Sequence, residues 1–590
     1  VIENYRIDKD KGRVVNFDES AILDWRNIVS FGTGSLGGKG RGLAFINTII
    51  NNLDFSELIP DMVIKTPRTA IIGTDEFELF MERNGLLAQV MHMDDYRKIR
   101  ELFLAGELSF ELKKRLKTFI RLINKPLAIR SSSIFEDSLL HPFAGIFETY
   151  ILPNSDPDFN VRYRQLQDAV KMVYASTYSI QARTYFEAVD YKVEEEKMAV
   201  IIQELIGNYN DDYFYPHISG TAQSYNYYPV AHMEPEDGLA VIALGLGRYV
   251  VEGEKAWRFS PKYPTIQNAS EKDQYKTSQV RFYAANLKQT DLNLLEGEDE
   301  GIIELDISEA EKHGNLNHLA SVYDTDNDTI SPGLDTPGPR ILNFANILQY
   351  EYTPLAKTIE VLLDVVQEAI GTPVEIEYAV DLNRDAKLRT SFYLLQIKPM
   401  VGNENNFKVD MGKADHDSTL LYAEKSLGNG YIGDIKDVVY VDPEKFDKLR
   451  TEEIAQEITK INDSMRAQNM QYVLIGPGRW GTRDRFIGIP LKWPQISNAK
   501  VIVETELEDF PLDASLGSHF FHNVTSMNVG YFSIHEGGEN YINYDLLNEQ
   551  ETIFESIYFK HIRFQVPLSI IMDGKKRKAV ITIGKDTESQ

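Results

Sequence analysis

The sequence predicts a multidomain protein of the α+β or α/β class. Its 590 residues are too many for one hydrophobic core, so we expect about two to four domains. Apolar runs of strand length, such as 198–206, alternate with amphipathic helical stretches, such as 160–193. Glycine-rich and proline-rich turns separate these segments. With 43% hydrophobic and 26% charged residues, the composition is typical of a soluble globular protein.

Charge and composition exclude several classes of function. A net charge of −27 argues against nucleic-acid binding, although a local group of Lys and Arg could still hold a phosphate. The absence of Cys excludes disulfides, thiolate catalysis and Cys-ligated zinc, and is compatible with the cytoplasm. No apolar run reaches the length of a membrane span. Since the chain begins without an initiator Met or a signal-peptide core, an upstream domain or a partner protein remains a hypothesis.

The stretch 127–149 is a candidate polyphosphate site. Its apolar start ends in Arg130, as at the end of a buried strand, and three serines, an acidic pair and a small-residue turn at Gly145 follow. Arg supplies a fixed fork of donors for phosphate oxygens, and hydroxyls and backbone amides near Gly can surround an anion. The alternative is a surface loop with an Arg–Glu ion pair.

A glycine-rich loop at 31–43 precedes a predicted helix over 44–52. Glycines before a helix expose its N-terminal amides, and Lys39 adds positive charge for an anion. The loop is not a Walker A motif, because Lys39 is not followed by Ser or Thr. A flexible turn is the alternative. Arg68, in a later strand-and-turn segment, is a second candidate phosphate ligand or one half of a surface ion pair.

The apolar run 198–206 is predicted to be a buried strand that carries Gln203 and Glu204. A strand in this setting often lines an adenine pocket with its backbone amide and carbonyl groups. The alternative is a core strand whose polar residues lie at its edge.

Two later strands could hold a magnesium–nucleotide complex. Alternation places Glu375 and Glu377 on one face of the first strand, and it places Gln396 and Lys398 on one face of its partner. Mg²⁺ takes one or two protein oxygens together with phosphate oxygens. The alternative is cross-strand Glu–Lys pairing on a solvated face, and burial of the sheet would favour the metal site.

The order of the motifs resembles the ATP-binding N-terminal domain of phosphoenolpyruvate synthase and pyruvate phosphate dikinase, over roughly residues 30–400. This resemblance implies an ATP-grasp-like fold. The motifs are Gly-Gly-Lys at 37–39, Ile-Arg-Ser-Ser at 129–132, Phe-Ala-Gly at 143–145, Ile-Gln at 202–203, Gly-Leu-Gly at 245–247, Ile-Glu-Tyr at 376–378 and Leu-Gln-Ile-Lys-Pro at 395–399.

The resemblance assigns roles to individual residues. Lys398 stands where the family usually has Arg, which keeps the charge but loses the bidentate fork. The other assigned residues are Lys39, Arg68 and Arg130 for the nucleotide phosphates, Gly145 for a mobile loop over them, and Glu377 and Gln396 for the metal–phosphate end.

We therefore predict three parts. Residues 1–215 and 216–402 would be two ATP-grasp-like subdomains, the second with an acidic, loop-rich insertion at 290–340. Residues 403–590 would form a smaller α+β domain, and a degenerate form of the family's swivelling phosphohistidine domain is one interpretation of it. These remaining residues are too few for both that domain and the barrel that binds phosphoenolpyruvate in complete enzymes.

His519 is the candidate phosphoryl acceptor within the chain. Ser518-His519 faintly resembles the phosphate-accepting loop of the swivelling domain, where a His at a helix start receives the phosphate. A helix-capping Ser with a packed His is the alternative.

In all, the sequence predicts a cytoplasmic phosphotransferase that uses ATP and Mg²⁺, with Arg130, Lys398 and His519 as catalytic residues and an otherwise unknown acceptor. One rival is a non-catalytic ATP sensor that shifts its domains and reports to a partner. The other is a scaffold that keeps only the fold.

Overall fold

The computed structural model describes most of residues 12–584, and every structural statement below refers to the described residues. They fall into two compact units, Val1–Val251 with Lys255–Met400, and Glu252–Glu254 with Val401–Gln590. The gaps within 12–584 are 135, 137–144, 190, 228, 230–231, 267–269, 401–417, 429, 483, 508–509, 511, 513–519, 521–523, 525–528, 536, 538 and 574–576.

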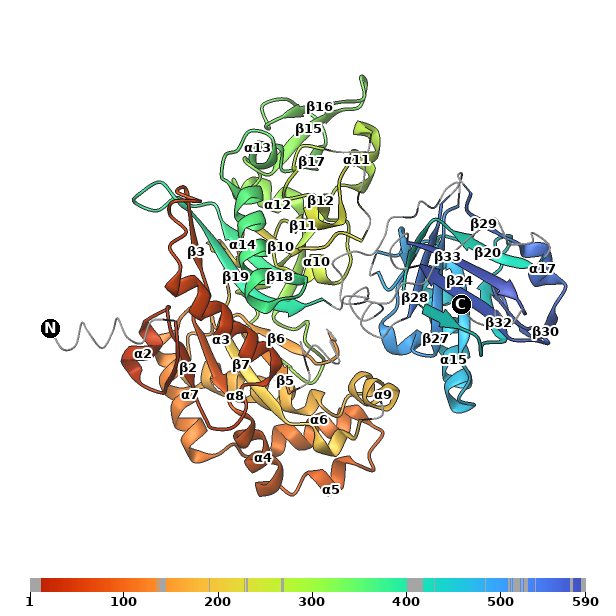
Figure 1. The fold of residues 1–590 in the computed structure, drawn as a ribbon. Helices are drawn as coiled ribbons and strands as arrows, with labels where there is room; N and C mark the ends of the chain where they lie inside the picture. The colour runs from red at the N-terminus through yellow and green to blue at the C-terminus, as the bar shows by residue number, and fades with distance from the viewer. Residues whose placement is uncertain are drawn as a thin grey trace. The chain divides into compact units, whose positions relative to one another are not determined.

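The first unit starts with a six-stranded sheet in the order β1-β2-β4-β7-β5-β6 (Figure 1). Its strand β5 pairs with β7 on one side and β6 on the other, and it carries Arg130. The apolar start of β5, Leu127–Ile129, is buried, as expected for a strand covered on both faces. The strands are β1 (Val14–Asn16), β2 (Ile28–Ser30), β4 (Thr69–Ile72), β5 (Leu127–Ser133), β6 (Thr149–Leu152) and β7 (Met198–Glu204).

Helices accompany this sheet, and α3 and α8 both pack against β5. The helix predicted over 44–52 begins earlier, at Gly37, so its first turn is made of the glycine-rich loop itself. The helices are α2 (Glu19–Leu23), α3 (Gly37–Asn52), α4 (Thr74–Arg83), α5 (Leu87–Val90), α6 (Tyr96–Ala105), α7 (Phe110–Leu122), α8 (Phe159–Ser176) and α9 (Ile180–Ala188).

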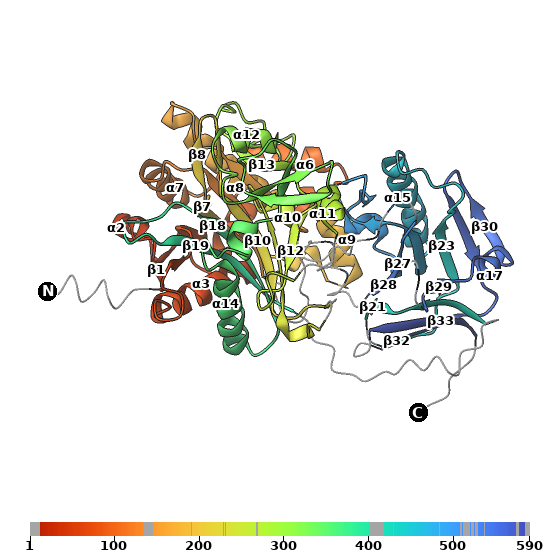
Figure 2. The ribbon, with the colours of Figure 1, turned by 90° about the horizontal axis from the view of Figure 1, so that it is seen from above.

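A second six-stranded sheet has the order β12-β11-β10-β18-β19-β3. Its strand β3 comes from the early part of the chain, between two strands of the first sheet, and runs parallel to β19. Helix α14 (Leu355–Ile370) packs on β10 and β18 through an apolar face (Figure 2). The strands are β3 (Met62–Lys65), β10 (Ile218–Gln223), β11 (Leu239–Ala243), β12 (Trp257–Phe259), β18 (Val374–Asp381) and β19 (Thr390–Pro399).

Two smaller sheets complete the first unit, in the orders β14-β13-β9-β8 and β16-β15-β17. The segment 290–340, predicted to be loop-rich, contains three strands and a helix, because short apolar pieces such as Ile302–Ile303 pair between its polar turns. The elements are β8 (Asn208–Asn210), β9 (Tyr213–Tyr215), α10 (Arg248–Val251), α11 (Glu271–Thr277), β13 (Arg281–Asn286), β14 (Ile302–Asp306), α12 (Ile307–Lys312), β15 (Ala320–Asp324), β16 (Thr329–Pro332), β17 (Arg340–Leu342) and α13 (Ala345–Leu348).

The second unit contains a seven-stranded sheet in the order β21-β28-β27-β24-β23-β31-β30. Its four consecutive strands β28, β27, β24 and β23 are parallel, and α15 (Thr451–Ala467) connects β23 to β24. The strands are β21 (Lys425–Leu427), β23 (Asp437–Val441), β24 (Tyr472–Pro477), β27 (Ala499–Thr505), β28 (Gly530–Ile534), β30 (Glu551–Glu555) and β31 (Phe559–Arg563).

A five-stranded antiparallel sheet, in the order β22-β32-β33-β20-β29, shares one apolar core with the larger sheet of the second unit. A mixed α/β architecture with a further domain after the first unit confirms the predicted fold class. The remaining elements are β20 (Thr419–Ala423), β22 (Gly430–Ile432), β25 (Arg479–Trp480), β26 (Gly488–Ile489), β29 (Tyr541–Ile542), α17 (Tyr544–Asn548), β32 (Leu568–Asp573) and β33 (Lys578–Ile583).

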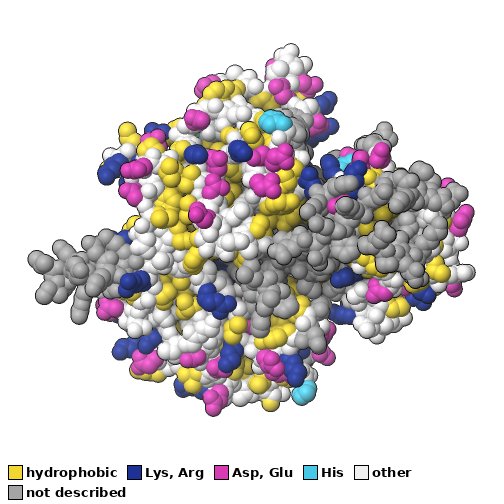
Figure 3. Space-filling view, viewed as in Figure 1, with side chains coloured by type: hydrophobic (Ala, Val, Ile, Leu, Met, Phe, Trp, Pro, Cys, Tyr) yellow, Lys and Arg dark blue, Asp and Glu magenta, His cyan; other side chains and the backbone are white. Residues whose placement is uncertain are grey.

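On the face drawn in Figure 3, acidic and basic side chains are interspersed, with hydrophobic side chains between them. Among the described helices, none combines the length and the apolar character needed to cross a membrane.

Candidate functional site

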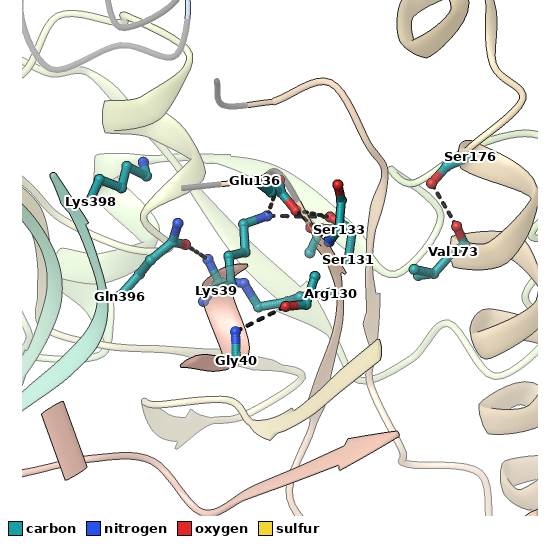
Figure 4. Close-up of polar contacts among 12 residues, drawn as sticks. Lys39, Gly40, Arg130, Ser131, Ser133, Glu136, Val173, Ser176, Gln396 and Lys398 are labelled. Atoms are coloured by element: carbon teal, nitrogen blue, oxygen red, sulfur yellow. Dashed lines mark hydrogen bonds and ion pairs between the residues drawn. The ribbon is translucent and has the colours of Figure 1, made fainter. Parts of the chain in front are cut away.

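Lys39 lies in the first turn of α3, and its ammonium group faces the end of β5 (Figure 4). Its Nζ lies 2.6 Å from Oε1 of Glu136 and 3.3 Å from Oγ of Ser131. The hydroxyl of Ser131 donates to the other Glu136 oxygen at 3.2 Å. Both Lys39 and Glu136 are buried, so a carboxylate balances this cation inside the protein.

The glycines before Lys39 permit close packing between α3 and the segment after β5. A Cβ atom on Gly37 would lie 1.9 Å from the carbonyl oxygen of Ser132, and one on Gly38 would lie 1.3 Å from that of Glu136. The hydroxyl of Ser132 accepts the Gly40 N–H at 2.9 Å. The absence of side chains at these glycines therefore lets Lys39 lie beside Glu136. The sequence predicted that the first amides of the helix would be exposed, but the Gly40 N–H is already bonded to a hydroxyl of β5.

Arg130 connects the two six-stranded sheets of the first unit. From β5 its Nη2 donates to Oε1 of Gln396 at 2.5 Å (Figure 4). The same Nη2 donates to Oε2 of Glu377 at 3.3 Å. Its Nη1 donates to Oε1 of Gln203, on β7, at 3.3 Å. The structure thus brings together four of the predicted site residues from the four strands β5, β7, β18 and β19.

Lys398 lies next to this group on β19. The register pairs Glu375 with Lys398 and Glu377 with Gln396, as strand alternation predicted. Nζ of Lys398 lies 2.5 Å from Oε1 of Glu377 and 3.3 Å from Oε1 of Glu375, and the lysine is 1% exposed. The cross-strand pair is therefore buried rather than solvated. Burial raises the pKa of Glu375, and the neighbouring Lys398 opposes that effect.

Gln223, on β10, supports this arrangement from the next strand. Its Nε2 donates to Oε2 of Glu375 at 2.6 Å, so each oxygen of that buried carboxylate has a donor. Sequence reasoning did not single out Gln223, which is the last residue of β10 and belongs to no motif.

Arg68 and Glu204 form an ion pair with each other. Nη1 of Arg68 lies 2.9 Å from Oε2 of Glu204, and Nζ of Lys125 lies 3.1 Å from its Oε1. Glu204 is the last residue of β7 and lies opposite Leu127, at the start of β5. Gly145 is exposed and has a left-handed φ of +68°. His519 lies outside the described residues.

Glu136 and Glu196 are buried carboxyls that the predicted site did not include. Glu196 accepts the N–H of Ile134 at 3.2 Å, just beyond the end of β5. Burial raises the pKa of Glu196 to about 7, and the carboxylate of Glu136 adds to the effect. The acidic residues after the serines drew attention in the sequence, but no motif marks Glu196.

The donor set suits a magnesium ion that is shared with phosphate oxygens. Among the described residues, no group of three or more His, Cys, Asp or Glu side chains is arranged to hold a metal by itself. Glu377 and Gln396 each offer an oxygen at the same place, where both accept from Arg130. One or two protein oxygens completed by phosphates is the environment that Mg²⁺ prefers.

Cations beside carboxylate and amide oxygens suit a phosphate group together with a magnesium ion. The family described as pyruvate phosphate dikinase, AMP/ATP-binding domain, matches residues 33–418. The chain belongs to this family, which confirms the resemblance seen in the sequence.

Two curated proteins are similar to parts of the chain. An uncharacterized phosphotransferase, YvkC, from Bacillus subtilis (strain 168) is 29% identical over 193 residues, which is 32% of this chain and 20% of that protein. Phosphoenolpyruvate synthase from Aeropyrum pernix is 22% identical over 213 residues, which is 32% of this chain and 24% of that protein. The similarity therefore spans about a quarter or less of these relatives.

Proposed function

We propose that the chain is a Mg²⁺–ATP-dependent phosphotransferase of the phosphoenolpyruvate synthase/dikinase type that acts in the cytoplasm. The observation that carries the proposal is the convergence of Arg130, Glu377 and Gln396 on one point between two sheets. Membership of an AMP/ATP-binding family and similarity to a named phosphotransferase support it. An ATP-grasp-like arrangement of the two sheets is part of the proposal.

Lys39 and Arg130 would neutralise the phosphate charge of ATP. Each is now balanced by a glutamate, and each would exchange that partner for phosphate oxygens when the nucleotide binds. Phosphoryl transfer depends mainly on positioning and charge neutralisation, which cations held in buried geometry provide.

Glu377 and Gln396 would hold the metal ion and the phosphate end of ATP. When bound, Mg²⁺ would supply further charge neutralisation at the phosphates. Lys398 would orient Glu377 and balance its charge, because its Nζ lies 2.5 Å from that carboxylate. Gln203 would hold Arg130 in place for the nucleotide, because its Oε1 accepts from Nη1 of Arg130.

Three further residues keep proposed roles at the edge of the site. Arg68 would reach a phosphate only by leaving its ion pair with Glu204, and Gly145 would lie in the loop over the nucleotide. The acceptor would be His519 or a separate molecule.

Calorimetry with Mg–ATP on the wild type, Arg130→Ala and Arg164→Ala tests the site. Arg164 is exposed and makes no described bond, so its variant is the control for the loss of one positive charge. We expect Arg130→Ala to weaken binding by at least about 100-fold, as the loss of a charged phosphate contact predicts, with an unchanged circular dichroism spectrum. Equal affinities in all three proteins would contradict the placement of Arg130.

A non-catalytic ATP sensor is the second candidate. Lys398 is almost fully buried between two glutamates, an arrangement that holds a side chain in place more than it offers it to a substrate. Incubation with β- and γ-labelled ATP separates the two functions. A protein-bound label that is acid-labile and lost in His519→Ala supports transfer to that histidine. ATP binding without a protein-bound label and without turnover would support the sensor. If ATP does not bind at all, the scaffold hypothesis would be supported.

A further inference from the structure

A pocket lies beside the start of β5, where the chain enters that strand and where it leaves β6. Its volume is about 310 Å³, and the residues that carry the argument are Asn124, Asn154, Asp156, Arg162, Tyr209 and Leu287. Asn124 precedes β5 and Asn154 follows β6, so the pocket is separated from Arg130 by at least the about 10 Å of strand between Leu127 and Arg130. It is distinct from the proposed nucleotide site.

Arg162, in the first turn of α8, is the cation of this pocket. Among the described residues no carboxylate lies within 4.0 Å of its guanidinium group. Its Nε is buried with no acceptor, and its Nη1 donates only to Oδ1 of Asn154, at 3.3 Å. A partly buried guanidinium that lacks an anionic partner can accept one from solution without breaking an existing ion pair.

The wall of the pocket is fixed by the backbone around Asn154. This residue has a left-handed φ of +53°, and its side-chain amide donates to the carbonyl groups of Ile123 and Lys125 at 3.0 Å each. The hydroxyl of Ser155 donates to the carbonyl of Leu287 at 2.6 Å. These bonds join the loops before β5, after β6 and after β13, so the pocket is formed before any ligand binds.

The charges around the pocket favour an anion that also carries a hydrogen-bond donor. The guanidinium groups of Arg121 and Arg162 both lie over the ring of Phe159, at 5.5 and 5.8 Å, and no described carboxylate pairs with Arg121. Asp156 is the one carboxylate among the lining residues, and its Oδ1 accepts the N–H of Asp158 at 2.7 Å. Its other oxygen can accept from a ligand hydroxyl.

We propose that this pocket binds a small hydroxylated acid, with the carboxylate or phosphate of the ligand on Arg162 and a hydroxyl group on Asp156. The exposed ring of Tyr209 forms one side, and its hydroxyl donates to the carbonyl of Asn124 at 3.4 Å. A volume of about 310 Å³ is at the small end for ligand pockets, which matches a compact acid rather than a nucleotide. The proposal does not depend on ATP binding by the chain.

Calorimetry on the full chain with glycerate and glycerol 3-phosphate tests the proposal. The two probes share a diol and differ in the anion, so the tighter binder tells whether the pocket is built for a carboxylate or a phosphate. We expect one of them to bind, and we expect Arg162→Gln to weaken it about tenfold or more, the usual effect of losing a charged hydrogen bond. Arg164→Gln, two residues further on the exposed side of α8, should bind like the wild type.

Two more variants make the outcome decisive. Asn124→Trp places a large ring at an exposed position of the pocket and should abolish binding of the probe. Because Arg162 is unchanged in this variant, it tests the pocket even if the Arg162→Gln protein fails to fold. Arg130→Ala should bind the probe like the wild type, because the pocket is separate from the nucleotide site. Binding of neither probe, unchanged affinity in Asn124→Trp, or loss in Arg130→Ala would each overturn the proposal.

Discussion

The proposed nucleotide site and the Arg162 pocket hold their cations in opposite ways. Lys39, Arg130 and Lys398 each have a glutamate within 3.3 Å. Arg162 has an amide oxygen and an aromatic ring but no described carboxylate. When each buried cation is paired with a glutamate, the free-energy cost of burying its charge without a ligand is small. A phosphate must then compete with that glutamate for the cation. A cation without a carboxylate partner can bind an anion without displacing a glutamate. Until the anion binds, water must solvate part of its charge.

The largest effect that we expect from this difference is a loss of folding stability in the Lys398→Met variant. Lys398 is buried and balances Glu375, so its removal leaves a fully enclosed carboxylate without a cation. We expect the free energy of unfolding of the first unit to fall by about 3–5 kcal/mol, measured by urea denaturation. Lys125→Met is the control, because Lys125 is 45% exposed in its pair with Glu204 and should cost about 0–1 kcal/mol. Similar losses in both variants would show that the Glu375 pair is not buried in solution.

Strand alternation predicted which residues of each strand lie together, Glu375 with Glu377 on β18 and Gln396 with Lys398 on β19. That both pairs lie on the same face of the sheet depends on the strand register, which the structure supplies. The helix over 44–52 was also predicted, but its start at Gly37 was not. That start depends on how closely the backbone of α3 approaches the end of β5, a distance that glycine content alone does not give.

Other parts of the site could not be predicted from the sequence, because they join segments that meet only in the folded chain. The pairing of Lys39 with Glu136 and the position of Glu196 behind it are examples. The Arg162 pocket is another, since its lining comes from loops that carry no motif. Arg68 and Glu204 were each assigned to a nucleotide, and strand register pairs them with one another.

A middle-sized effect should appear as a pH dependence near the Lys39–Glu136 pair. The pKa of Glu196 is raised by burial to about 7 from a usual value of 4.5, so folding favours its protonated form. The stability that this gives is fully present below pH 4.5 and is lost as the pH rises through 7. We expect the wild type to lose about 2–3 kcal/mol more than Glu196→Gln between pH 4.5 and 8 in urea denaturation series.

Glu195→Gln is the control for this measurement, because Glu195 is exposed and adjacent in the chain. It should follow the pH dependence of the wild type. A Glu196→Gln profile that runs parallel to the wild type at all pH values would mean that Glu196 is ionised in the folded protein. In that case an ionised Glu196 would lie near the buried carboxylate of Glu136, which disfavours a second negative charge.

The smallest effect should come from Arg162→Gln in the absence of any added acid. Because Arg162 has no carboxylate to leave behind, its removal orphans no buried charge, and a Gln can still donate toward Asn154. We expect its free energy of unfolding to change by at most about 1 kcal/mol, close to that of Arg164→Gln, in the same urea series. A loss near that of Lys398→Met would show that Arg162 is a structural cation like those of the nucleotide site. A small loss combined with the loss of acid binding would establish that a guanidinium can be kept in this fold for a ligand rather than for stability.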